Sequence, residues 1–243
     1  MKCRSALLLL GSLLLLTGVS WRAFPFSLPL DEVDANASLL ILASHPNPQP
    51  SDSEDPSMGV APMIGVSVPI AVAGPMFVEP GLELLGWYYR WNSNAGAAEI
   101  TQSENGLGFF TIGAILSLQA GVRFPIATNL TLGGAIGLDF FARVPAEFQN
   151  TGSSVKSDED SAVGWFYGKG RFFYPETRAF LRWHVSEPVD LVFNVRAFYP
   201  VYHFWDGAGQ PFWDALMISG GVGFAIRLKP AASAAALTAP AAK

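Results

Sequence analysis

Apolar residues alternate one by one with small or polar residues along the chain from Phe109 to Val144. Even-numbered positions are apolar from 110 to 124 and, after a short turn at 125–129, are apolar or glycine from 130 to 144. The odd-numbered positions between them hold mainly Gly, Ala, Ser, Thr, Gln and a few charged residues. Successive side chains of a strand point to opposite faces, so this period of two predicts a hairpin with one apolar and one small-or-polar face.

The same alternation recurs along most of the chain and predicts eight strands. These strands are expected at residues 36–44, 57–69, 77–91, 109–124, 130–145, 172–185, 189–203 and 214–228. The first of them is the least regular, and a short helix is the alternative there. The connections at 70–76, 125–129 and 186–188 are short, whereas those at 45–56, 92–108, 146–171 and 204–213 are longer and mostly polar. Short turns on one side and long loops on the other are typical of outer-membrane barrels, with the short turns in the periplasm.

The composition favours a membrane barrel over a soluble β-protein. Charged residues make up only 14% of the chain, against roughly 25% in soluble domains. After residue 30, no apolar run approaches the length of a spanning helix. A soluble sandwich or lipocalin-type barrel also alternates, but its outer face is polar, and here the second face contains few Lys or Glu. The predicted fold is therefore all-β, an eight-stranded antiparallel transmembrane β-barrel located in the cell outer membrane.

The two ends of the chain are expected to lie outside the barrel. Lys2 and Arg4 precede an apolar stretch that is too short to span a membrane, which predicts a signal peptide at 1–23 with cleavage near 20–23. The rest divides into an N-terminal lead at 24–35, the barrel at 36–228 and a disordered Ala/Pro-rich tail at 229–243. Cys3 is the single cysteine, so no disulfide is expected in the mature chain.

Charged and polar side chains on the small-residue face are expected to point into the barrel. The predicted lumen-facing polar residues are Glu83, Gln119, Arg123, Asp139, Arg143, Glu176, Arg178, Arg182, Asp190, Asn194, Arg196 and Arg227. The interior of an eight-stranded barrel is only wide enough for side chains to fill it. Opposite charges confined there should pair, because unpaired buried charges are costly. Two interpretations stay open: an ion-pair plug that stabilises the barrel, or a narrow or gated conduit.

Aromatic residues gather at the predicted strand ends, where they would sit at the lipid headgroup level. At the long-loop side they are Trp87, Tyr88, Tyr89, Trp91, Trp165, Phe166, Tyr167, Phe172, Phe173, Tyr174, Tyr199, Tyr202, Phe204, Trp205, Phe212 and Trp213. Phe77, Phe124 and Trp183 would mark the other rim.

The last predicted strand contains the most motif-like segment, residues 219–226. It has a polar residue, a glycine two positions later and then alternating hydrophobics, and its signal residues would be Ser219, Gly221, Phe224 and Ile226. This segment resembles the terminal assembly signal of small outer-membrane barrels, although those proteins usually end on an aromatic residue and this chain continues. Together with the strand count and the loop lengths, residues 36–228 resemble the OmpW family and the transmembrane domain of OmpA. The first resemblance implies passage of small hydrophobic molecules, and the second implies a largely plugged barrel.

One pattern has a catalytic look, the His184-Val185-Ser186 segment. It resembles the His-x-Ser motif of lipid A deacylase barrels, in which His activates Ser for acyl transfer. Its predicted position is the periplasmic turn, far from the outer leaflet, so no enzyme is expected. His45 and His203 fall in loops without a ligand set, and the acidic residues 158–160 are interpreted as a solvated loop, so neither a metal nor a cofactor is expected. Lys and Arg number 15 without a cluster and the net charge is −5, which excludes a nucleic-acid partner.

The function expected from these features is that of a porin-like outer-membrane barrel serving as a narrow conduit for small or hydrophobic solutes. The alternative is a non-conducting structural or surface-interaction barrel that acts through its extracellular loops, and a lipid A-modifying enzyme is a remote third. The expected partners are outer-membrane lipid and the barrel-assembly machinery, with host or environmental ligands at the loops. The loops at 92–108 and 146–171 are rich in Gly, Ser, Asn and acidic residues, so they are expected to be exposed and poorly ordered.

Overall fold

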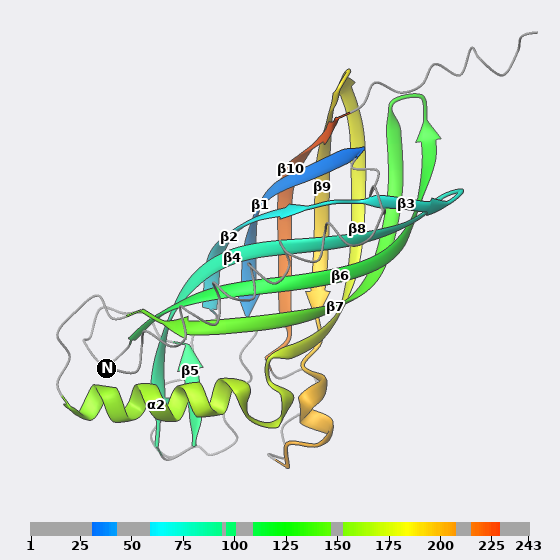
Figure 1. Ribbon diagram of the computed structural model, residues 1–243. Helices are drawn as coiled ribbons and strands as arrows, with labels where there is room; N and C mark the ends of the chain where they lie inside the picture. Colours follow the sequence, from blue (N-terminus) through cyan, green and yellow to red (C-terminus); the bar gives the residue numbers. More distant parts are fainter. Residues whose placement is uncertain are drawn as a thin grey trace, which may run out of the picture.

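The computed structural model describes residues 31–42, 59–93, 96–100, 109–146, 153–207 and 215–228. Within these ranges, eight antiparallel strands close into a barrel (Figure 1). The barrel strands are β1 (Glu32–Leu42), β2 (Gly59–Ser67), β4 (Met76–Asn92), β6 (Phe109–Ala127), β7 (Leu130–Pro145), β8 (Phe173–Ser186), β9 (Val189–Phe198) and β10 (Met217–Arg227). Neighbours in sequence order pair with each other, and β10 pairs with β1 to close the ring. The predicted eight-stranded antiparallel barrel is confirmed.

Two further short strands belong to the same sheet. β3 (Ile70–Ala73) continues β2 and pairs with β4, and β5 (Ala97–Ile100) pairs with the far end of β4. Pro69 lacks a backbone N–H and interrupts the strand between β2 and β3. The predicted connection at 70–76 is therefore mostly strand, and the turn itself is at Gly74, whose φ of +53° suits glycine.

The register explains why residues far apart in sequence meet inside the barrel. A walk from strand to strand that starts at Leu85 passes through the paired residues of every other barrel strand and reaches Arg123. The N–H of Arg123 bonds to the carbonyl of Pro75, so the walk returns to β4 about ten residues from its start. This displacement is the shear of the barrel, and it goes with strands tilted by roughly 40°. Each strand therefore contributes side chains to several successive layers of the interior.

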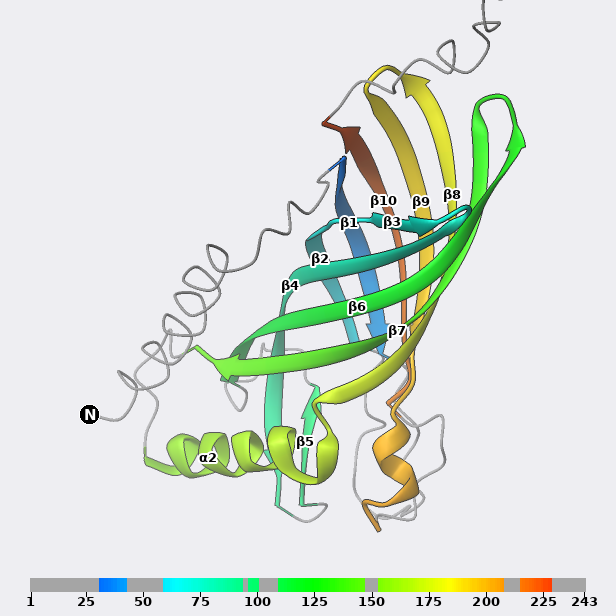
Figure 2. The same cartoon turned by 45° about the vertical axis from the view of Figure 1, so that its right-hand side comes forward.

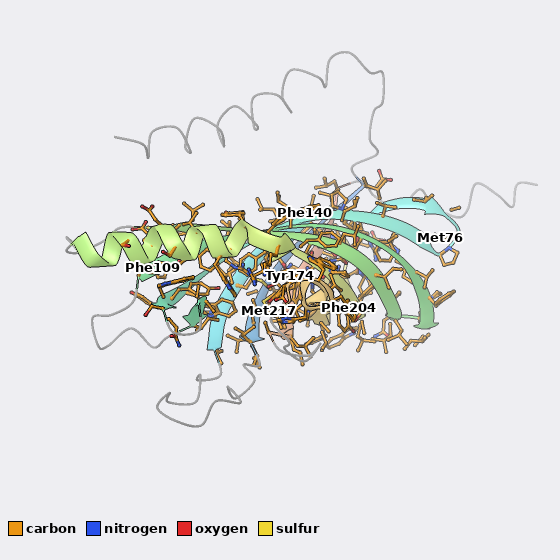
Figure 3. The ribbon with its side chains drawn as sticks, turned by 90° about the horizontal axis from the view of Figure 1, so that it is seen from below. Met76, Phe109, Phe140, Tyr174, Phe204 and Met217 are labelled. Atoms are coloured by element: carbon orange, nitrogen blue, oxygen red, sulfur yellow. The ribbon has the colours of Figure 1, made fainter. Side chains whose placement is uncertain are left out.

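The two faces of the strands differ as the alternation predicts. Exposed apolar side chains cover the outside of every barrel strand, and Ile136 (68% exposed) and Leu118 (57%) are typical. The inside holds two apolar clusters, one toward the loop end and a smaller one toward the turn end, with buried charges between them. Figure 3 looks from the loop end and shows Tyr174 and Met217 over the middle of the barrel, with Met76 at its margin.

The loop end carries an ordered cap. Helix α2 (Ser153–Tyr167) packs against β4, β5 and β7 (Figures 1 and 2). Short 3-10 turns, η2 (Gly168–Gly170) and η3 (Val201–Phe204), continue the cap. Ala162 and Phe166 lie one turn apart on the helix and are completely buried. The prediction of poorly ordered loops was wrong for 153–167 and 97–100, which form α2 and β5. Both segments are stabilised by packing against the barrel, which their polar composition does not indicate.

Strand ends also differ from the prediction. β1 begins at Glu32 instead of residue 36, so residues 32–35 belong to the barrel and not to a lead segment, and β9 ends at Phe198 instead of 203. No helix in the described part of the chain is long and apolar enough to cross a membrane. The predicted signal peptide at 1–23 and tail at 229–243 lie outside the described residues.

Candidate functional site

The centre of the barrel is an ion cluster around Arg196. This guanidinium, on β9, donates from Nε to Glu176 Oε2 at 2.8 Å and also pairs with Glu83. Its Nη2 lies 3.6 Å from Asp139 Oδ1. All four side chains are buried, and they come from β4, β7, β8 and β9. Three carboxylates therefore gather on one arginine and tie four strands together across the lumen.

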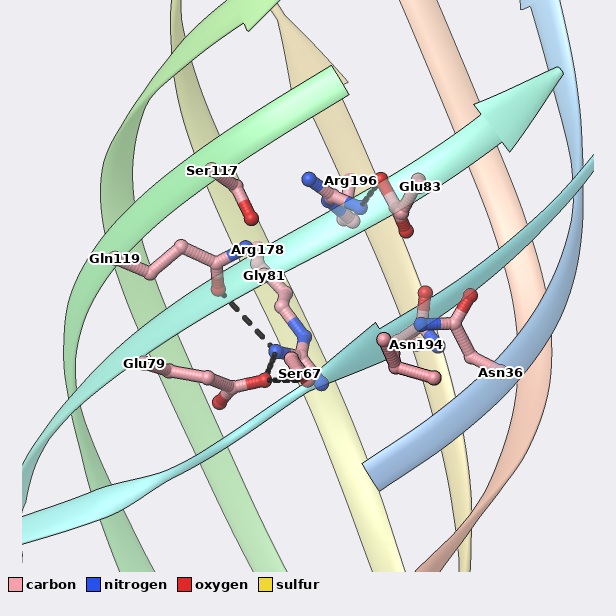
Figure 4. A pocket seen from close by; sticks show the side chains of 11 residues that line it. Asn36, Ser67, Glu79, Gly81, Glu83, Ser117, Gln119, Arg178, Asn194 and Arg196 are labelled. Carbon is pink, nitrogen blue, oxygen red and sulfur yellow. Dashed lines mark hydrogen bonds and ion pairs between the residues drawn. The ribbon is translucent and has the colours of Figure 1, made fainter. Parts of the chain in front are cut away.

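A second polar layer lies next to it on the turn side (Figure 4). Arg178 Nη1 donates to Glu79 Oε1 at 2.7 Å and to Gln119 Oε1 at 3.2 Å, and Ser67 also donates to Glu79. The cavity between these two layers has a volume of about 10 Å³, which is room for about one water molecule. The lumen at this depth is filled by side chains.

The first strand contributes a third layer. Arg182 on β8 bonds to Glu32 and to Asp34 Oδ2 at 2.8 Å, and Arg123 on β6 lies 3.5 Å from Glu32. Both acids are buried. They were missed because the predicted strand began at residue 36, although Glu32, Asp34 and Asn36 alternate with Val and Ala.

The turn end closes with an apolar cluster and one more ion group. Phe77 and Phe180 meet edge to face with centroids 5.9 Å apart, and a side chain at Gly133 would clash with the Phe180 ring. Closer to the turns, Asp190 accepts a hydrogen bond from Arg227 at 2.8 Å and lies 2.7 Å from His184 Nδ1.

Toward the loop end, Arg143 occupies a cage of aromatic rings. Its guanidinium carbon lies 4.0 Å from the ring centre of Phe141 and 5.1 Å from that of Phe166, and Nη2 donates to the hydroxyl of Tyr174 at 3.1 Å. Cation–π attraction stabilises a desolvated guanidinium in such surroundings. Phe166 also packs on Tyr89 at 4.8 Å, so α2 inserts an aromatic plug into the mouth.

A second arginine fixes the rest of the cap. Arg171 lies 4.6 Å over the ring of Trp165 and pairs with Asp206 at 3.5 Å. His203 Nδ1 lies 3.3 Å from the same carboxylate, and Tyr202 of η3 is buried against Tyr174. Helix α2 and η3 are thereby held together over the lumen.

The predicted lumen-facing residues are placed in the interior, and most of them are paired there. Glu83, Gln119, Asp139, Arg143, Glu176, Arg182, Asp190, Asn194 and Arg196 are buried, the side chain of Arg178 is also buried, and Arg123 and Arg227 are half-buried. Glu32, Asp34, Glu79 and Asp206 were not among the predicted residues, and only the first three had an alternation signal. Of the proposed assembly residues on β10, Ser219 is buried, Gly221 packs against Ser38, and Phe224 and Ile226 face outward.

The aromatic prediction needs a correction. Trp87, Tyr89, Phe166, Tyr174 and Tyr202 are not at the lipid headgroup level but inside, in the core beneath the cap, and Phe77 is likewise inside near the turn end. Outward-facing strands and inward-facing plugs both favour aromatic residues, so clustering at strand ends did not distinguish them. His45, Phe212 and Trp213 lie outside the described residues. His184 is bonded to Asp190, and Ser186 is exposed at the turn end.

No family model and no curated protein matches this chain. Among solved structures, Neisserial surface protein A is 11% identical, with 81% of this chain and 96% of that chain covered and a TM-score of 0.45. Ail of Yersinia pestis, solved in complex with the heparin analogue sucrose octasulfate, is 8% identical, with coverages of 81% and 97% and a TM-score of 0.43. A de novo designed transmembrane β-barrel is 11% identical, with coverages of 79% and 95% and a TM-score of 0.35. Likenesses of this strength carry no information on function, and the resemblance to OmpW or OmpA stays a prediction.

Proposed function

We propose that this chain is a non-conducting barrel of the bacterial outer membrane that presents an ordered cap, built from α2, β5 and η3, to the exterior. The observation that carries the proposal is the filled lumen: ion-paired layers and aromatic clusters occupy it from Asp190 at the turn end to Phe166 at the mouth.

The outer surface supports a lipid environment. Leu116, Leu118, Ile136, Val195 and Phe224 are each between 48% and 68% exposed, which a water-soluble exterior would not tolerate over a whole barrel. Among the described side chains that face outward from the barrel strands, none is charged. An apolar band of about 25 Å on a closed antiparallel barrel is what outer-membrane proteins present to lipid.

The interior supports closure over conduction. Opening a path past Arg196 would separate it from Glu83, Glu176 and Asp139 and leave buried charges without partners. The mouth is closed a second time by Phe166 and Tyr202, which are fully buried. Function is therefore assigned to the exposed cap, as a surface-interaction barrel, and the proposal contains no enzymatic step.

Recordings across planar lipid bilayers test this proposal. Folded protein, checked by heat-modifiable gel migration, should give no steady conductance, and vesicles containing it should swell in small solutes no faster than empty vesicles. Stable single-channel currents, or solute-dependent swelling, would overturn it in favour of a conduit.

A further inference from the structure

The apolar outer face of the barrel is much taller on one side than on the other. On β6 the alternating exposed apolar side chains run from Ile112 to Ile126, and on β7 from Leu132 to Val144. On β9 the outward apolar positions run only from Val189 to Ala197. At an axial rise of roughly 2.5 Å per residue in a strand tilted by about 40°, the wall is about 35 Å tall on β6 and about 20 Å on β9.

The surplus lies at the loop end. The turns that end β6 and β8 both project at the turn end of the barrel, whereas β4 runs past the ends of β1 and β2 toward α2 (Figures 1 and 2). The inner side of this extension is covered by α2 and β5. On its outer side, Ile112 and Val144 are 45% and 46% exposed.

An aromatic border follows the taller wall. Tyr88 and Phe110 are directly opposite each other on β4 and β6, with ring centres 5.0 Å apart, and the Phe110 ring occupies the space that a side chain at Gly86 would take. On the shorter side, the outward Tyr199 follows the end of β9, and its hydroxyl bonds to Thr177. Leu85 belongs to the same inner cluster as Phe198. Tyr88, three residues beyond Leu85 on β4, lies about 7 Å farther from the turn end than Leu85 does.

We infer that the outer-leaflet lipid boundary is uneven around this barrel, so that acyl chains cover Ile112 and Val144 on the β6–β7 side while the boundary lies lower, near Tyr199, on the β9 side. Lipid is the occupant because the extension continues the lipid-facing surface of the same strands without a break. It also ends on Tyr88, and tyrosine favours the headgroup level. A bilayer adapts to such a mismatch by thickening locally at modest cost. The inference rests on the proposed function, since it requires that the barrel span the membrane.

Spin-label accessibility in lipid vesicles tests it. In a Cys3→Ser background, nitroxide labels are placed at Ile112→Cys and Val144→Cys. Leu118→Cys serves as a mid-wall control on β6, and Ser157→Cys on the exposed side of α2 as a water control. Collisions with oxygen report lipid and collisions with a water-soluble nickel chelate report water. The expected oxygen-to-nickel ratios at 112 and 144 are similar to that at 118 and well above that at 157.

Each alternative outcome decides a different point. Water-like ratios at 112 and 144, with a lipid-like ratio at 118, would overturn the uneven boundary and leave the membrane barrel intact. Low access of both reagents, with spin–spin broadening between labels, would also overturn it and indicate a second copy of the chain on this wall. A water-like ratio at 118 in folded protein would instead refute the proposed function itself.

Discussion

The hydroxyl of Tyr167 bonds to both backbone groups of Arg143: it accepts from the N–H and donates to the carbonyl oxygen, each at 2.9 Å. Arg143 lies on β7 beyond Phe140, and Phe140 is paired with Phe173, the first residue of β8. The β8-facing edge of β7 therefore has no strand partner at Arg143. A single side chain at the end of α2 thus takes the place of a partner strand. Tyr167 thereby holds the cap over the mouth at the point where β7 extends beyond its pairing with β8.

Tyr167→Phe should loosen the cap without opening the barrel. The substitution removes both bonds and leaves two backbone groups of Arg143 without these partners, at an expected local cost of about 1–3 kcal/mol. Hydrogen exchange should become faster in α2 and unchanged in β8 to β10. Ser157→Ala, on the exposed side of the same helix, is the control and should leave the exchange of α2 as it is. Equal exchange of α2 in both variants would show that the hydrogen bonds between Tyr167 and Arg143 do not stabilise the cap.

Arg196→Met should be among the most destabilising changes in the lumen. It leaves Glu83, Glu176 and Asp139 buried without their common cation, and removing one partner of a buried pair costs about 3–5 kcal/mol. Arg227→Met is the matched control, because the Arg227 side chain is 34% exposed and water can replace part of its contact with Asp190. Denaturant unfolding in lipid vesicles should show the smaller loss for the control. The reverse order would contradict the role given to the central cluster.

Leu118→Arg should destabilise the barrel by about 2–4 kcal/mol, because the new charge would face the acyl chains near the middle of the lipid face. Ile126→Arg, at the turn end of the same strand and equally exposed, should cost roughly 0–1 kcal/mol, as expected near the interface. Reversible unfolding from vesicles measures both. Equal costs at the two positions would contradict the placement of Leu118 near the middle of the membrane and of Ile126 near its interface.

Much of the wall was predictable and much of the interior was not. Period-two alternation placed β6, β7 and β8, and it covered all of β9 and β10 while extending both too far. It did so because lipid outside and a packed lumen inside demand opposite residue types at successive positions. It also pointed Glu83, Arg182 and Arg196 inward. The partners of these residues depend on the shear of the barrel, which brings Arg182 to Glu32 and Asp34 across the lumen. The value of the shear cannot be read from any local sequence pattern.

The cap was missed for a different reason. Helix α2 is mostly polar in its first half, and the residues that pack into the core, Ala162, Trp165 and Phe166, all lie near its end, so its composition resembles that of a loop. Its stability comes from the aromatic core at the loop end of the lumen, where Phe166 packs with Tyr89, Phe141 and Arg143. Tertiary burial of this kind overrides weak local propensity and is not visible along the chain.

Labelling of intact cells tests most directly that this is an outer-membrane barrel with its cap outside. A Cys3→Ser background makes an introduced cysteine the only one in the chain. Ser157→Cys on α2 and Ser186→Cys at the turn between β8 and β9 are both at exposed positions. A membrane-impermeant maleimide should label residue 157 on intact cells and should label residue 186 only after the outer membrane is permeabilised. Labelling of 186 but not 157 on intact cells would contradict the orientation, and labelling of neither until the inner membrane is broken would contradict the location.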